Sequence, residues 1–156
     1  MSNDTQTDCA ERAKAFSSGF DAAMGFRVVS ASRDEVVIEY DIDERHRQPY
    51  GIVHGGVHCA AVEGACSMGA GIDALAHGKA VVGVENHTSF IHAVRRGPVR
   101  VTATPITRGR RSQVWEATAR DEAGKVVATG RVRLLCLEPG SDLAGEAVAA
   151  RPGQHG

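Results

Sequence analysis

One stretch decides both the fold and the chemistry of this chain, residues 48–67, which read QPYGIVHGGVHCAAVEGACS. From its His-Gly-Gly onward, apolar residues recur at helical spacing: Val57, Ala61, Ala65, Met68, Ile72 and Leu75. This spacing predicts a long helix over about residues 55–76, and Gly78 is placed to end it. The preceding segment, Asp43 to Val53, has no periodicity and contains Pro49 and Gly51, which predicts a loop.

Strands are predicted on both sides of this helix. Residues 36–43 alternate between apolar and polar side chains, the period of a half-buried strand, and Phe26–Ala31 is placed to pair with them. Four further strands are predicted after the helix: Ala80–Phe90, Val99–Thr107, Ser112–Arg120 and Val126–Leu137. Short connections such as Asp121–Gly124 favour hairpins and an antiparallel sheet. The sequence therefore predicts an α+β domain in which a curved antiparallel sheet wraps one long helix.

Length and composition limit the possible classes of function. The 156 residues suit a single domain, predicted at 20–138 between an N-terminal extension at 1–19 and a disordered tail at 139–156. A helix is predicted over Cys9–Met24, with Gly25 as its cap. The net charge of −1 argues against a nucleic-acid or membrane-surface partner. Four scattered cysteines and the polar N-terminus favour free thiols in a reducing cytoplasm and no signal peptide.

The start of the long helix has the features of an oxyanion site. The first N–H groups of a helix lack intrahelical acceptors, and Gly55-Gly56 would let a carbonyl oxygen approach them. Glu63, two turns later, is a lone carboxylate among Ala, Gly, Val and Cys, with Ser67 one turn beyond it. If it is buried, such a carboxylate suits a base or nucleophile, although the residue type alone also fits solvent exposure or an ion pair with an arginine across a subunit contact. The pair His54 and His58 lacks a carboxylate at metal-site spacing, so no metal is expected.

The combination Gln48, His54, Gly55, Glu63 and Ser67 resembles the hotdog-fold acyl-CoA thioesterases. The resemblance covers residues 20–138. It lies with the branch containing the Arthrobacter-type 4-hydroxybenzoyl-CoA, phenylacetate-pathway and 1,4-dihydroxy-2-naphthoyl-CoA enzymes. It implies a hotdog domain that hydrolyses an aryl or arylacetyl-CoA thioester to acid and CoA. It implies no separate cofactor, and active sites at the interface of a homodimer or homotetramer.

The same resemblance implies a role for each residue. Glu63 would attack the thioester carbonyl or activate water, while Gly55 N–H and the Gln48 side chain polarise that carbonyl. His54 would help to form the site, and Ser67 would orient Glu63. The residues implied to contact the acyl group and CoA are Val82, Ser89, Phe90, Ile91, His92, Ile106, Thr107, Arg108, Gly109, Arg110 and Arg111.

Two other functions remain open at this stage. One is an acyl-CoA-binding hotdog protein without catalysis, against which the intact Glu63, Gln48 and Ser67 speak. The other is a hotdog enoyl-CoA hydratase, which would need an Asp-x-x-x-x-His spacing after the helix that the sequence does not contain.

Overall fold

The computed structural model describes residues 18–148. In chain order the elements are α2 (Gly19–Ala23), β1 (Arg27–Ala31), β2 (Val36–Asp41), the 3-10 helix η1 (Glu44–His46), α3 (Gly55–Leu75), β3 (Ala80–Phe90), β4 (Pro98–Arg108), β5 (Ser112–Arg120), β6 (Val126–Leu137), β7 (Asp142–Leu143) and β8 (Glu146–Ala147). The predicted helix and strand boundaries for α3, β3, β4, β5 and β6 agree with the structure to within one residue.

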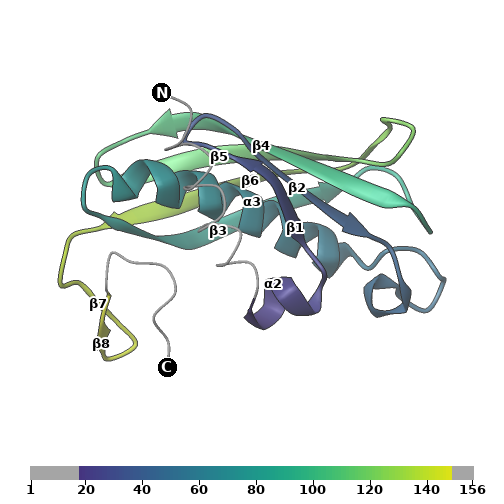
Figure 1. The fold of residues 1–156 in the computed structure, drawn as a ribbon, viewed down its shortest axis with the longest axis horizontal. Coiled ribbons are helices and arrows are strands. Elements are labelled where there is room, and N and C mark those ends of the chain that lie inside the picture. The colour runs from purple at the N-terminus through teal and green to yellow at the C-terminus, as the bar shows by residue number, and fades with distance from the viewer. Residues whose placement is uncertain (1–17, 149–156) are drawn as a thin grey trace.

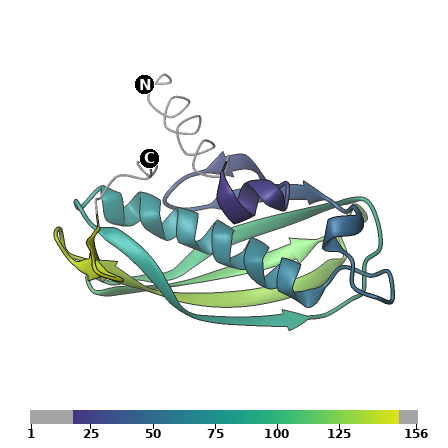
Figure 2. The same cartoon turned by 90° about the horizontal axis from the view of Figure 1, so that it is seen from below.

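Six strands form one antiparallel sheet in the order β1-β2-β4-β5-β6-β3. Figure 1 shows α3 crossing the sheet, and Figure 2 shows it lying along the concave face. Register shifts interrupt the pairing of β1, β3 and β4, and such bulges add local bend and twist to a sheet. The predicted fold class, one long helix wrapped by a curved antiparallel sheet, is confirmed.

Small side chains on α3 allow the sheet to approach the helix closely. Trp115 of β5 is fully buried, and its ring lies against Gly69, where a Cβ would overlap it. Ala61 and Ala65 fill the space between α3 and apolar side chains of the sheet such as Val101. The helix contributes little side-chain volume to the core, so most of that volume comes from side chains of the sheet. Because the sheet lies close to the helix, the core can be filled although only 4% of the residues are aromatic.

The ends of the described chain differ from the sequence predictions. Of the helix predicted over Cys9–Met24, the structure describes Gly19–Ala23 as helical, and residues 1–17 lie outside the described part. Gly25 follows this helix with a φ of 70°, as expected for a glycine cap. Residues 142–147, predicted to be disordered, pair as the β7–β8 hairpin (Figure 1), and 149–156 lie outside the described residues.

The loop before α3 contains more structure than predicted. Glu44–His46 form a 3-10 turn, and His46 is completely buried. Asp43 N–H donates to His46 Nδ1 at 2.9 Å, so His46 Nε2 carries the proton and donates to the Met24 carbonyl at 2.7 Å. This histidine ties the loop to the end of α2.

Three of the four cysteines fall within the described residues, and all three are free thiols. Cys66 is fully buried in α3, and burial raises the pKa of its thiol. None of the described helices is both long and apolar enough to span a membrane.

His58 is a buried histidine whose titration opposes folding. Its Nδ1 shares a 3.3 Å hydrogen bond with the Tyr40 hydroxyl, and its side chain is 4% exposed. Burial lowers the His58 pKa from 6.5 to about 4. The unfolded chain therefore binds a proton at pH values where the folded chain does not, and protonation favours unfolding.

We expect the free energy of unfolding to fall as the pH is lowered from 6.5 to 4. Each pKa unit corresponds to roughly 1.4 kcal/mol, so the His58 contribution is about 3 kcal/mol. Denaturant unfolding at pH 7 and at pH 4.5 measures it, with His58→Gln as the comparison because glutamine does not titrate. An equal pH dependence in both proteins would contradict the prediction.

Candidate active site

At the N-terminus of α3 the structure leaves a backbone donor, the Gly55 N–H, without an acceptor in the described part of the chain. His54 is the N-cap residue, and its Nδ1 accepts the Gly56 N–H at 2.8 Å. No acceptor among the described residues takes the Gly55 N–H. A Cβ at Gly56 would crowd the His54 ring, and one at Gly55 would lie 2.6 Å from the Phe90 ring. A side chain at either position would therefore displace one of these rings, whereas with glycine the Gly55 N–H remains available to an oxygen of a ligand.

Gln48 lies in a tight turn that leads into this helix. The Gly51 N–H donates to the Gln48 carbonyl at 2.8 Å, and Gly51 has a φ of 76°. The Gln48 Oε1 accepts the Tyr50 N–H, at 2.5 Å. This bond orients the side chain toward its own loop and leaves the amide N–H₂ as the group that could donate to a ligand.

The Glu63 carboxylate is half-buried and is held from two elements. Ser67, one turn later on α3, donates its hydroxyl to Glu63 Oε1 at 3.3 Å. Asn86 of β3 donates its Nδ2 to Glu63 Oε2 at 2.9 Å. Among the described residues no basic side chain pairs with this carboxylate. Within one chain the Glu63 carboxylate is therefore held by two uncharged hydrogen-bond donors.

The sequence did not indicate Asn86, because a bulge changes the phase of β3. Before the bulge, Gly83 pairs with the buried Leu134 and faces α3. The register shifts between Gly83 and Glu85, so that Asn86 then faces α3 and Glu85 faces outward. Strict alternation from Gly83 would have placed Glu85 beside the helix instead.

The predicted catalytic residues fall into two groups within one chain. Glu63 and Ser67 lie midway along α3, whereas His54 and Gly55 are at its start. Glu63 lies eight positions after Gly55, and at 1.5 Å per residue this is about 12 Å along the helix axis. The Gly55 N–H and Glu63 of the same chain therefore do not meet around one carbonyl group.

The residues predicted to contact substrate are also divided between the two ends of the sheet. Phe90 faces α3 next to Gly55, and Ile91 and His92 follow it at the end of β3. Val82 and Ser89 pair with Leu135 and Thr129 and lie on the outer face, away from α3. The turn containing Ile106, Thr107, Arg108, Gly109, Arg110 and Arg111 lies at the opposite end, where α3 terminates.

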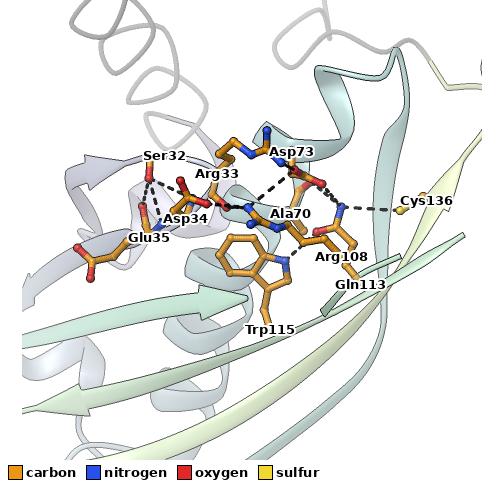
Figure 3. Close-up of polar contacts among 10 residues, drawn as sticks. All are labelled: Ser32, Arg33, Asp34, Glu35, Ala70, Asp73, Arg108, Gln113, Trp115 and Cys136. Atoms are coloured by element: carbon orange, nitrogen blue, oxygen red, sulfur yellow. Dashed lines mark hydrogen bonds and ion pairs between the residues drawn. The ribbon is translucent and has the colours of Figure 1, made fainter. Parts of the chain in front are cut away.

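Arg108 is engaged by the protein itself (Figure 3). Its Nη1 donates to the Arg33 carbonyl at 2.7 Å and to Asp34 Oδ1 at 2.8 Å. Asp73, buried near the end of α3, lies 3.9 Å from the same nitrogen and pairs with Arg33 at 2.9 Å. Arg108 thus joins the β1–β2 turn to the β4–β5 turn. Arg110 and Arg111 are exposed beside it, and no described carboxylate pairs with them.

A cavity of about 360 Å³ opens beside this turn. Gln113 forms part of its wall, donating to Asp73 Oδ2 at 3.1 Å and accepting the Trp115 Nε1–H at 2.8 Å (Figure 3). Lys79 and Arg110 contribute positive charge to the lining. Within the described residues no cluster of His, Cys, Asp and Glu has the arrangement of a metal site.

Comparison with known proteins shows which family has this sequence and fold. A family model described as the thioesterase superfamily matches residues 50–128, which is just over half of the chain. The chain belongs to the thioesterase superfamily. A Mycobacterium tuberculosis protein named as an esterase is 40% identical over 121 residues, covering 76% of this chain and 86% of the relative. A 1,4-dihydroxy-2-naphthoyl-CoA hydrolase of Listeria monocytogenes is 31% identical over 113 residues, covering 72% and 91%.

Solved structures agree with this membership. The structure of the M. tuberculosis esterase has a TM-score of 0.75, covering 76% of this chain and 96% of that one. A Haemophilus influenzae thioesterase has a TM-score of 0.79 at 30% identity, covering 83% and 90%. The helix and curved sheet of this superfamily member form the hotdog fold, as predicted. Membership supports thioester hydrolysis as the general activity.

Proposed function

We propose that this thioesterase-superfamily protein hydrolyses an acyl-CoA thioester, with an aryl or arylacetyl group as its acyl part, to the free acid and CoA. The observation that carries the proposal is the Glu63 carboxylate, which is half-buried, has no basic partner among the described residues, and is held by Ser67 and Asn86. A carboxylate fixed in this way suits attack on a carbonyl carbon or removal of a proton from water.

The reaction consumes one water molecule. By the general-base route, Glu63 removes a proton from water, the hydroxide adds to the thioester carbon, and the C–S bond breaks. The CoA thiolate then leaves and takes up that proton. By the nucleophilic route, Glu63 attacks the thioester carbon, the C–S bond breaks, and CoA leaves as its thiolate while the acyl group forms a mixed anhydride with Glu63. Water then hydrolyses the anhydride to the free acid and the Glu63 carboxylate, and the proton released from that water goes to the CoA thiolate. Either way, charge develops on the carbonyl oxygen, and the free Gly55 N–H is suited to stabilise it.

We further propose that the complete site forms between two copies of the chain. Glu63 and the start of α3 are about 12 Å apart within one copy. β3 is an edge strand of the sheet, and its Asn86 contacts Glu63. A second copy joined at this edge would therefore lie beside Glu63 and could supply Gln48, His54 and Gly55. The exposed Val84 and Phe90 of β3 would be covered by the same contact.

We propose that one CoA molecule contacts both ends of the sheet. One of these ends belongs to one copy of the chain, and the other end belongs to the second copy. Phe90, Ile91 and His92 lie beside the Gly55 end, and the exposed Arg110 and Arg111 suit the phosphates of the nucleotide. Arg108 is already paired with Asp34, so we assign it to holding the turn. The Listeria relative named as a naphthoyl-CoA hydrolase supports an aryl acyl group.

The proposed function is tested with a panel of thioesters. The panel contains benzoyl-, 4-hydroxybenzoyl-, phenylacetyl-, dihydroxynaphthoyl-, acetyl- and palmitoyl-CoA, and thiol release is followed with a disulfide reporter dye. We expect turnover of aryl or arylacetyl-CoA above that of acetyl- and palmitoyl-CoA. The corresponding N-acetylcysteamine thioester lacks the nucleotide, and we expect a higher KM for it. No turnover across the panel would favour acyl-CoA binding without catalysis.

A further inference from the structure

The structure assigns Asn86 as a positioning residue for Glu63, an inference that rests on the proposed function. The Asn86 Nδ2 makes two hydrogen bonds, to Glu63 Oε2 at 2.9 Å and to the Cys59 carbonyl at 3.1 Å. The Asn86 Oδ1 accepts the Thr88 hydroxyl at 2.6 Å. Because one end of the amide only donates and the other only accepts, these three contacts fix its orientation.

This contact links the catalytic carboxylate to two elements. The Cys59 carbonyl is one turn before Glu63 on α3, and Asn86 and Thr88 are on β3. With Ser67 at the other oxygen, the Glu63 carboxylate is held by one donor from its own helix and one from the sheet. A carboxylate at the end of a flexible side chain loses rotamer freedom when two donors hold it, which favours one attacking geometry.

Gly83 provides the space for the carboxylate. A Cβ at this position would overlap Glu63 Oε1, so any larger residue would displace the acid. The bulge that follows Gly83 is what turns Asn86 toward the helix. Gly83 therefore leaves space for the Glu63 carboxylate, and the bulge brings Asn86 within hydrogen-bond distance of it. Strand β3 thus contacts Glu63 as well as pairing with β6.

The matched control for Asn86 is its neighbour His87. It lies on the same strand and pairs with Arg131 on the outer face, and no hydrogen bond or ion pair among the described residues joins it to Glu63. Replacing either residue removes a polar side chain from the exposed part of β3. A difference between Asn86→Ala and His87→Ala is therefore specific to the side of the strand that faces α3.

We expect Asn86→Ala to lower kcat by about 10–100-fold with little change in KM, because it affects a group that acts in the chemical step. His87→Ala should leave both unchanged, and thermal denaturation checks that each variant is folded.

A double-variant cycle decides the assignment. If Asn86 acts through Glu63, Asn86→Ala should have no further effect on kcat in a Glu63→Gln protein. An equal loss of kcat in both backgrounds, or wild-type activity of Asn86→Ala, would overturn the assignment while leaving the proposed function in place. A wild-type protein that is inactive on the whole thioester panel would instead remove the proposed function, and this assignment with it.

Discussion

Glu63→Gln is expected to reduce kcat for acyl-CoA hydrolysis by about 10²–10⁴-fold, the range for loss of a positioned general acid or base. Glutamine has nearly the same shape, but its amide can neither attack a carbonyl carbon nor accept a proton from water. Its oxygen can accept from Asn86 Nδ2, and its N–H₂ can donate to Ser67 Oγ, so both contacts of the carboxylate have replacements. The variant should therefore fold and bind substrate with a similar KM.

Steady-state kinetics and thermal denaturation of the two proteins measure this prediction. Glu85→Gln is the matched control, because Glu85 is an exposed carboxylate on β3 that pairs with Arg133 at 3.1 Å. We expect Glu85→Gln to retain wild-type kcat. Full activity of Glu63→Gln would remove Glu63 from the mechanism. Glu63→Ala serves as a second variant if the glutamine protein does not fold, because it also removes the carboxylate, and wild-type kcat there would be equally contradictory.

Much of the fold follows from local sequence patterns. The boundaries of α3 follow from the spacing of its apolar residues and from Gly78, which has the positive φ of a helix terminator, 69°. Strands β4, β5 and β6 follow from alternation and from the turn ending at Gly124, with a φ of 79°. These signals depend on a few neighbouring residues, so sequence alone was sufficient.

The phase of β3 could not be predicted in the same way. Val81, Gly83, Glu85 and His87 form an unbroken alternating series in the sequence, but the bulge places Asn86 on the inner face. A bulge depends on how two strands fit around a third element, here the Glu63 side chain above Gly83. No local pattern marks it.

The contacts of Arg108 were also hidden from the sequence. An arginine in a turn suggests an anion-binding group. The acceptors of the Arg108 guanidinium, the Arg33 carbonyl and the Asp34 carboxylate, are in another turn, 75 and 74 positions earlier. Asp73 joins them from α3. Such a network is visible only once the sheet brings the β1–β2 and β4–β5 turns together, so sequence spacing cannot separate a phosphate ligand from a structural arginine.

If the site forms between two copies of the chain, a heterodimer of two variants that are each inactive alone should regain activity. The proposed groups lie on opposite sides of that contact: Glu63 and Asn86 from one copy, Gln48 and Gly55 from the other. A heterodimer of Glu63→Gln and Gln48→Ala would have one site with both substitutions and one with neither. Each single variant should lose about 10²-fold or more, as expected for a base or an oxyanion donor.

Purified heterodimers, obtained with two different affinity tags, should show about half of the wild-type kcat per dimer, because one of two equivalent sites is intact. The matched control pairs Glu63→Gln with Asn86→Ala. Both residues belong to the same half of a site and contact each other at 2.9 Å within one chain, so neither site of that heterodimer is intact. If activity is restored in the first pair and not in the control, Gln48 and Glu63 of each site come from different copies of the chain. No restoration in either pair would mean that a single chain brings the start of α3 to its own carboxylate, which would require a movement of more than one helical turn.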